Sequence, residues 1–289
     1  MKKHYLKTPL KGFFFFSVLL GLTACEKDLG IDDAVIDQDA VTDARSIYSN
    51  HTVNWDNRST DTYTYSEAVS DFGNISTTSG SWNESRAYNS NGTCRVTLLK
   101  NALSSACGLI VNIDVSDGTS YEMDWDVKFH SQFDWSTGGK VGFGFHIGDG
   151  NTGGDPGWDG NGGTLRVMWY NTGSRVFLQP YVYYKDQPTE YGDTFSKSYP
   201  SSGSLTKGTW YTVHLWVRLN TASNTDGNVE MKVNGTTVLS KNIRWVTNDA
   251  KRLVKEITFH TFRGGSQTYW QSDTDGYIYY DNLYWNKVE

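Results

Sequence analysis

Apolar and polar residues alternate one by one along most of the chain beyond residue 50, which is the period of β-strands with one buried face. In the segment 211–219 the odd positions are all apolar or aromatic, and Thr, His, Trp and Arg fill the even positions. The same period predicts strands at 121–129, 140–147, 165–170, 176–184, 255–262 and 276–285. Asn234-Gly235, between the alternating segments 230–233 and 236–239, predicts a tight hairpin. No stretch has a convincing helical period.

Many short strands separated by turns of Gly, Ser, Asn and Asp indicate an all-β fold. We expect a β-sandwich of jelly-roll type with a concave substrate groove, formed by residues 51–289 as one domain without internal repeats. Composition agrees, since 37% of the 289 residues are hydrophobic and Trp and Tyr (11 and 18) far outnumber Met (4). The formal net charge of −6 argues against nucleic acid as a partner, because its binding needs a basic surface.

The N-terminal residues predict a targeting segment. Four lysines precede the short apolar run 12–22, a layout typical of a secretory signal and too short for a transmembrane anchor. Leu22-Thr23-Ala24-Cys25 resembles a bacterial lipobox, so we expect residues 1–24 to be a lipoprotein signal peptide and Cys25 to carry the lipid, palmitate included. An ordinary signal peptide cut nearby is the alternative.

The residues that follow the lipobox predict a surface lipoprotein. Residues 25–50 are rich in Asp, Ala and Val without a sustained period, and we interpret them as a flexible acidic tether. Glu26-Lys27-Asp28 resembles the surface-export tag of Bacteroidetes lipoproteins. We therefore expect an outer-membrane lipoprotein exposed at the cell surface.

Cysteine usage fits an oxidising compartment. With Cys25 assigned to the lipid, Cys94 and Cys107 remain as an even pair. Such a pair predicts one disulfide that closes a short loop. A catalytic cysteine is the alternative, but neither residue lies in a recognisable nucleophile setting.

Three successive strands carry polar side chains on the face that alternates away from the core. In the segment 138–147, the apolar residues Val141, Phe143, Phe145 and Ile147 share one side, and Lys140 and His146 share the other with Gly142 and Gly144 between them. The two glycines leave bare backbone on which a ligand can lie flat, or they mark a bulge in a solvated strand.

The next two strands extend this polar face. Arg166 lies opposite the apolar side of 164–170, and Gln179, Tyr181 and Tyr183 alternate onto one side of 177–184. Arginine offers a fork that matches a carboxylate, and aromatic rings offer flat surfaces for pyranose stacking. Such a face predicts a site for an anionic sugar chain, and the turn 262–270 with Arg263 and Tyr269 is expected to border it.

Between these strands, the loop 149–160 combines acids, amides and glycines. Its spacing matches no EF-hand, so a structural calcium ion has no specific motif to support it, and a glycine-rich loop beside the groove is favoured. We expect neither a metal site nor a required cofactor.

Four sequence blocks resemble those of jelly-roll polysaccharide lyases. The blocks are Gly138-Gly139-Lys140, Arg166-Val167-Met168-Trp169, Tyr181-Val182-Tyr183 and Thr261-Phe262-Arg263-Gly264-Gly265. The group contains alginate lyases of family 14, glucuronan lyases of family 20 and ulvan lyases of family 28. The resemblance implies that the lysine and the tyrosines take part in catalysis, and that the arginine binds substrate.

Two departures from these blocks favour ulvan as the substrate. Lys140 is followed by Val-Gly-Phe-Gly, where alginate and glucuronan lyases tend toward Leu-Pro-Gly. Trp169 is followed by Tyr170, where those enzymes commonly have an arginine. We therefore expect an ulvan lyase, with alginate or glucuronan lyase as the alternative.

The predicted reaction is β-elimination of a 4-linked uronate. Removal of the C5 proton builds negative charge that Arg166, with Gln179 or His146, would stabilise. Lys140 or Tyr183 would act as the base, and Tyr183 or another phenol would act as the acid. A neighbouring arginine would lower the pKa of whichever residue is the base, as that role requires. The enzyme is expected to be a monomer that binds an anionic polysaccharide and touches the membrane only through its lipid.

Two other classes of protein remain open. A carbohydrate-binding lipoprotein would use the aromatic residues without chemistry, and the fold serves both roles. A glycoside hydrolase would need two carboxylates across a cleft, for which Asp124 and Asp126 alternate on one strand.

Overall fold

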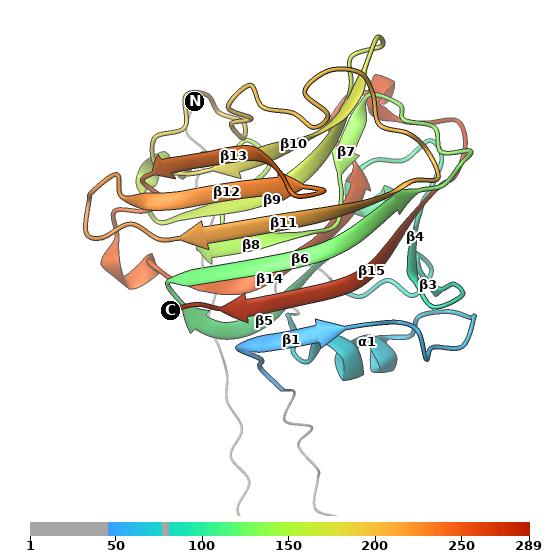
Figure 1. The fold of residues 1–289 in the computed structure, drawn as a ribbon, viewed down its shortest axis with the longest axis horizontal. Helices are drawn as coiled ribbons and strands as arrows, with labels where there is room; N and C mark the ends of the chain where they lie inside the picture. The colour runs from blue at the N-terminus through green and yellow to red at the C-terminus, as the bar shows by residue number, and fades with distance from the viewer. Residues whose placement is uncertain (1–45, 77–80) are drawn as a thin grey trace, which may run out of the picture. The chain divides into compact units, whose positions relative to one another are not determined.

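Two antiparallel sheets face each other in the computed structural model, which describes residues 46–76 and 81–289 (Figure 1). The eight-stranded sheet has the order β13 (Thr236–Ile243), β12 (Gly227–Val233), β11 (Trp210–Arg218), β6 (Ser120–Phe129), β15 (Gly276–Lys287), β4 (Cys94–Leu98) and β3 (Ala87–Asn89), with β1 (Asn50–Val53) also beside β15. The seven-stranded sheet has the order β10 (Val176–Tyr183), β9 (Gly162–Asn171), β7 (Gly138–Lys140), β14 (Val254–Arg263), β5 (Leu109–Gly118) and β2 (Ile75–Ser76), with β8 (Phe143–Gly148) between β14 and β9. The predicted all-β jelly-roll sandwich is confirmed.

Aromatic side chains from both sheets fill the space between them. Phe143 of β8 and Phe259 of β14 stack with ring centroids 4.2 Å apart on one side of the core. Trp125 of β6 and Tyr280 of β15 meet them edge-on at 5.9 and 5.2 Å from the other side. All four are buried, as the alternation predicts, because the intervening residues of each strand point away from the core.

The predicted strands are present, with one interruption. Asn234 and Gly235 both have positive φ, 48° and 74°, as a two-residue hairpin between β12 and β13 requires. The expected strand 140–147 is divided between β7 and β8, because the chain bends at Gly142, whose φ is +73°. A Cβ there would lie 2.5 Å from Nε1 of Trp125 in the core, so this glycine serves packing and offers no bare backbone to a ligand.

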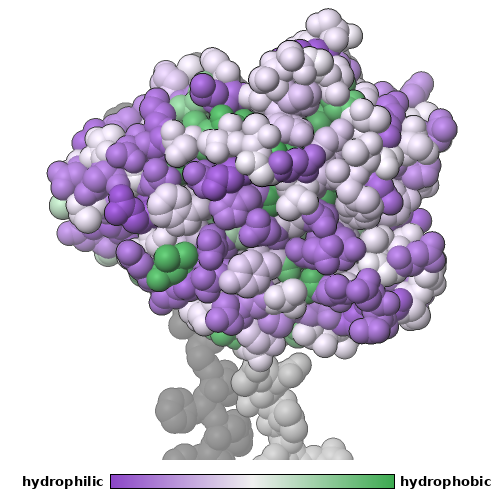
Figure 2. All heavy atoms as spheres, in the orientation of Figure 1, coloured by the Kyte–Doolittle hydropathy of each residue, from purple (hydrophilic) through white to green (hydrophobic). Residues whose placement is uncertain are grey.

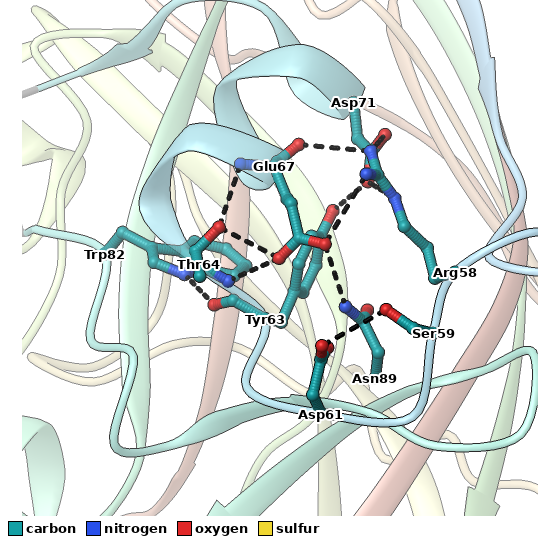
Figure 3. A network of polar contacts seen from close by, with 9 residues as sticks. All are labelled: Arg58, Ser59, Asp61, Tyr63, Thr64, Glu67, Asp71, Trp82 and Asn89. Carbon is teal, nitrogen blue, oxygen red and sulfur yellow. Dashed lines mark hydrogen bonds and ion pairs between the residues drawn. The ribbon is translucent and has the colours of Figure 1, made fainter.

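The expectation of no convincing helix is wrong for the first third of the domain. Helix α1 (Tyr65–Phe72) starts with a capping box, in which the Glu67 amide donates to Thr64 Oγ1 at 3.2 Å and the Thr64 amide donates to the Glu67 carboxylate at 2.8 Å (Figure 3). Arg58 and Tyr63 both donate to the Asp71 carboxylate, at 3.2 Å from Arg58 Nε and 2.5 Å from the Tyr63 hydroxyl. These contacts attach α1 to the segment before it. One further helix, α2 (Ser104–Cys107), and three 3-10 turns (Gly157–Asp159, Asp249–Lys251 and Thr268–Trp270) lie in loops.

The predicted disulfide is wrong. Both Cys94 and Cys107 are free, buried thiols. Cys94 starts β4, whereas the Cys107 carbonyl accepts from the Leu99 amide, five residues further along the same extended chain. At roughly 3.3 Å per strand residue, Cys94 and Leu99 are about 16 Å apart, and Cys107 lies about 5 Å from Leu99. The two cysteines are therefore further apart than the limit of about 7 Å between the Cα atoms of a disulfide.

The predicted signal peptide, Cys25 and nearly all of the acidic tether lie outside the described residues. Within the described residues, Tyr48 of the predicted tether pairs with Val115 of β5. Among the helices that the structure describes, none is long and apolar enough to cross a membrane.

Candidate active site

An open groove of about 720 Å³ lies on the face of the seven-stranded sheet that points away from the core. Its size is typical of ligand pockets. Six of the eight predicted catalytic and substrate-binding residues line it: Lys140, Arg166, Gln179, Tyr181, Tyr183 and Tyr269. Five of these six residues were predicted from the period of two, and Tyr269 was predicted from its place in the turn 262–270.

Strand register explains why these side chains meet. Arg166 of β9 pairs with Tyr181 of β10, and Met168 of β9 pairs with both Gln179 of β10 and Lys140 of β7. Residues at directly opposed register positions project to the same face of a sheet. The floor is thus a grid of neighbouring side chains, none of which depends on a flexible loop for its position.

Lys140 is almost wholly buried although it carries an amine. Its side chain is 7% exposed, and its Nζ lies 3.7 Å from Met168 Sδ and 3.7 Å from the centroid of the Tyr181 ring. Burial, and secondly the charge of Arg166, hold the pKa of Lys140 well below its usual 10.5. The lowered pKa favours the neutral amine, which is the form of lysine that can accept a proton.

Arg166 is a buried cation beside the Lys140 amine. It is 5% exposed, its guanidinium lies 5.7 Å from the Tyr181 ring centroid and 5.6 Å from that of Tyr183, and its Nε has no hydrogen-bond partner. Within the described ranges neither Arg166 nor Lys140 has an acidic partner. Because an unpaired buried charge is costly, Arg166 indicates a site that an anionic ligand completes.

The two tyrosines lie edge to face, with ring centroids 5.8 Å apart. The Tyr183 hydroxyl accepts a hydrogen bond from the Gly154 amide at 3.3 Å, which places the loop 149–160 beside the groove, as expected. Burial, with a contribution from Tyr183, raises the pKa of Tyr181, so this phenol keeps its proton and can donate it.

His260, which was not among the predicted site residues, is brought into the groove by β14. Asn112 Nδ2 donates to the Glu256 carboxylate at 2.6 Å, so Asn112 Oδ1 accepts from His260 Nε2 at 3.0 Å. This arrangement leaves His260 Nδ1 as a buried acceptor without a partner. Burial, and then the charge of Arg166, lower the pKa of His260 well below 6.5, so the ring is neutral. Alternation in β14 between core-facing Phe259 and His260 was the signal that pointed to it.

Two predicted substrate-binding residues lie elsewhere. His146 is on the same sheet but outside the groove lining, and its Nδ1 pairs with the Glu256 carboxylate at 2.5 Å. Arg263 is fully buried on the core side of β14, where its guanidinium donates to the carbonyls of Leu98 and Asp134. Arg263 follows Phe259 by four residues, so the period of two places both on the same side.

Aromatic side chains surround the groove, and acids do not line it. Tyr170, Tyr191, Tyr269 and Trp270 contribute to its walls, with Tyr191 and Tyr269 more than half exposed. No Asp or Glu of the described chain is among the lining residues, and Asp124 and Asp126 bond to His214 and Thr212 on the eight-stranded sheet. A two-carboxylate glycosidase site is therefore excluded for this groove. Among residues 46–76 and 81–289, no group of three His, Cys, Asp or Glu side chains is arranged to hold a metal ion.

Comparison with known proteins shows that this fold and groove are those of a polysaccharide lyase. The model of the polysaccharide lyase 14 family matches residues 87–283, and the chain belongs to that family. The solved structure of alginate lyase Aly36B is 67% identical, with a TM-score of 0.82, and the match covers 84% of this chain and 99% of that one. A variant of that enzyme with a lysine and a tyrosine replaced by alanine is solved with an alginate tetrasaccharide, and a lysine and methionine variant with a trisaccharide.

More distant relatives share the fold. The alginate lyase of Aplysia kurodai is 19% identical with a TM-score of 0.64, covering 84% of this chain and 99% of that one. The alginate lyase vAL-1 from Chlorella virus is 19% identical with a TM-score of 0.57, covering 80% and 99%. Among curated proteins, Exolysin of Paramecium bursaria Chlorella virus 1 is 27% identical over 184 residues, which are 53% of this chain and 27% of that protein.

Proposed function

We propose that this protein is an alginate lyase that cleaves the 4-linked uronate chain by β-elimination, leaving an unsaturated uronate end. The observation that carries the proposal is the burial of the Arg166 guanidinium beside the Lys140 amine, in a groove whose described lining residues include no carboxylate and no acidic partner for either group. A polyuronate supplies one carboxylate per sugar, which is the partner that Arg166 lacks.

The choice of alginate rests on the relative with the highest identity given above. Aly36B is 67% identical over nearly its whole length, and its lysine, tyrosine and methionine variants bind alginate oligosaccharides. This chain brings Lys140, Met168 and two tyrosines together in one groove. The departures in sequence that favoured ulvan therefore carry less weight, and alginate replaces ulvan as the expected substrate.

In the proposed mechanism, Arg166 binds the carboxylate of the uronate and stabilises the negative charge that develops at C5. The neutral amine of Lys140 takes the C5 proton, the C4–C5 double bond forms, and the bond from C4 to the glycosidic oxygen breaks. That oxygen receives a proton from a phenol, for which Tyr181 keeps its proton and Tyr183 lies beside it. Nδ1 of His260 accepts a hydrogen bond from a sugar hydroxyl.

The test is incubation of the purified protein with alginate, glucuronan and ulvan, followed by ultraviolet absorbance of the unsaturated product. The proposal expects product from alginate, and blocks rich in each of its two uronates would identify the preferred one. Product from ulvan alone would overturn the choice of substrate, and no product from any polyuronate would favour a binding protein.

We also propose that the enzyme is a lipoprotein of the outer membrane, held by Cys25. Support comes from the lipobox-like Leu22-Thr23-Ala24-Cys25 and from the acidic segment that follows it. A surface anchor would keep the enzyme beside a polymer too large to enter the cell.

A further inference from the structure

A row of alternating aromatic and cationic side chains crosses the outer face of the eight-stranded sheet. Directly opposed register positions join Trp210 of β11 to Lys128 of β6, Lys128 to Tyr279 of β15, Tyr279 to Arg95 of β4, and Arg95 to Tyr88 of β3. Five adjacent strands thus contribute one residue each, and at roughly 4.8 Å between strands the row is about 19 Å long. We call it the aromatic–cationic row.

Each cation of the row lies between aromatic rings. Lys128 Nζ is 4.4 Å from the Trp210 ring centroid and 5.0 Å from that of Tyr279. The Arg95 guanidinium is 4.2 Å from the Tyr88 centroid and 5.0 Å from that of Tyr277. These contacts hold the long side chains flat against the sheet and keep their charges near its surface.

Neither cation of the row has an acidic partner within the described part of the chain. Arg95 Nε also has no hydrogen bond. Two other basic groups on the same face do have acidic partners, since Lys232 contacts Glu230 at 2.6 Å and His214 contacts Asp124 at 3.0 Å. The row therefore differs from an ordinary charged sheet surface, on which cations and acids alternate (Figure 2 shows this face).

We propose that the aromatic–cationic row is a second, non-catalytic binding surface for an anionic polysaccharide. Its two unpaired cations match carboxylates along the polymer, and its rings offer the flat apolar surfaces on which pyranose rings stack. Alginate as the particular polymer rests on the proposed function, whereas the polyanionic class rests on the row itself.

The residues on either side of the row determine how the axis of a bound polymer lies on the sheet. On one side, Asp126 and Asp281 occupy the next register position, and burial together with the charges of Asp56 and Asp126 raises the pKa of Asp281. On the other side, His130 and Tyr277 continue the aromatic surface, with ring centroids 5.7 Å apart. A polyanion is repelled from the acidic side, so it lies along the row and across the strands.

The row is on the opposite sheet from the groove, so one enzyme can hold a polymer on its outer face while it cleaves another segment. We expect this surface to raise activity on long or gelled chains and to leave turnover of tetrasaccharides unchanged. Screening by salt should weaken the effect, because both cations are partly exposed.

The experiment measures retention in native gels that contain alginate, in a Lys140→Ala/Arg166→Ala background that removes cleavage and groove binding. The proposal expects retention to persist in that background. Adding Arg95→Gln and Lys128→Gln should raise the apparent Kd about tenfold, as expected for the loss of two exposed charge contacts. Lys232→Gln, which removes a paired lysine from the same face, is the matched control.

The same Arg95→Gln/Lys128→Gln pair in the active enzyme tests folding and function separately. Turnover of a tetrasaccharide and the melting temperature should match the wild-type, while activity on polymer falls. Retention that is unchanged by the pair, or lost completely in the groove background, would overturn the proposal. Binding to anionic phospholipid vesicles without any to polysaccharide would assign the row to membranes and also overturn it.

Different results would refute the alginate substrate and the binding role of the aromatic–cationic row. If alginate is not the substrate, the active enzyme releases no unsaturated product from it, and the gels are repeated with glucuronan and ulvan. If the row is not a binding surface, product forms normally and retention does not depend on Arg95 or Lys128.

Discussion

Replacing Lys140 by alanine tests the proposed base. General acid–base catalysis typically contributes about 10²–10⁴-fold in rate, which corresponds to about 3–5 kcal/mol of activation free energy. We expect the Lys140→Ala variant to lose turnover by that factor on alginate, measured as the initial rate of ultraviolet absorbance. The fold should persist, because the only hydrogen bond of Nζ in the described chain is the 3.7 Å contact with Met168 Sδ.

The pH profile gives an independent measure of the same group. Only the neutral amine accepts a proton, so kcat/KM of the wild-type should rise with pH through the lowered pKa of Lys140. The free energy of unfolding should also rise with pH. Between the lowered folded pKa and the usual 10.5, the unfolded chain binds more protons, so the unfolding free energy of the wild-type should rise with pH relative to Lys140→Met. Below that window the two curves should run parallel.

Two controls make the result decisive. Lys232→Ala removes a lysine from the eight-stranded sheet and should leave turnover unchanged. Tyr183→Phe removes one hydroxyl from the groove and should lower turnover, with only a small fall in melting temperature from the lost acceptor of the Gly154 amide. Wild-type turnover in Lys140→Ala, or a Lys140→Met variant with the same pH dependence of stability as the wild-type, would refute the assignment of Lys140 as a neutral base.

The other predictions concern Arg166 in the groove, Arg263 in the core, the two buried thiols and the lipid anchor. Arg166→Ala should raise KM and lower kcat together, since Arg166 contacts the carboxylate before and during elimination; a change in neither parameter contradicts this role. Arg263→Ala should lower the melting temperature, because it deletes the donors to two buried carbonyls, while the correctly folded fraction keeps its KM. Mass spectrometry of unreduced, unfolded protein should find Cys94 and Cys107 both alkylated, and a peptide linked by the two would disprove it. Cys25→Ser should release the protein from membranes, and unchanged retention would rule out the lipid anchor.

Local alternation determined which residues share a face of a strand, and the structure confirms the predicted faces of the groove strands. Lys140, Arg166 and Tyr181 were placed on the polar side of their strands, and register brings all three into one groove. The physical reason is that successive side chains of a strand point to opposite faces whatever the rest of the fold does. The same rule, applied to 254–263, identifies His260 and excludes Arg263. Arg263 was misplaced because the end of this strand was treated as a turn, whereas His260 lies within the predicted strand 255–262, whose polar face was not considered.

Other features depend on contacts between residues far apart in sequence. The bend at Gly142 exists because Trp125 of the opposite sheet occupies the space that a Cβ would need. The separation of Cys94 from Cys107 follows from the pairing of Leu99 with Cys107, which no cysteine count reveals. Strand order is likewise non-local, and it decides which polar faces become neighbours.

The sequence by itself therefore determined the fold class, the buried side of most strands and the blocks that resemble polysaccharide lyases, because each depends on a period of two or on a short motif. Only the tertiary structure decided that Lys140 and Arg166 are buried together without acidic partners in the described chain, and that Arg95 and Lys128 line up on the opposite sheet. Charge pairing and desolvation depend on which strands lie side by side, and in this sandwich the neighbours of β14 and β15 come from segments more than a hundred residues away.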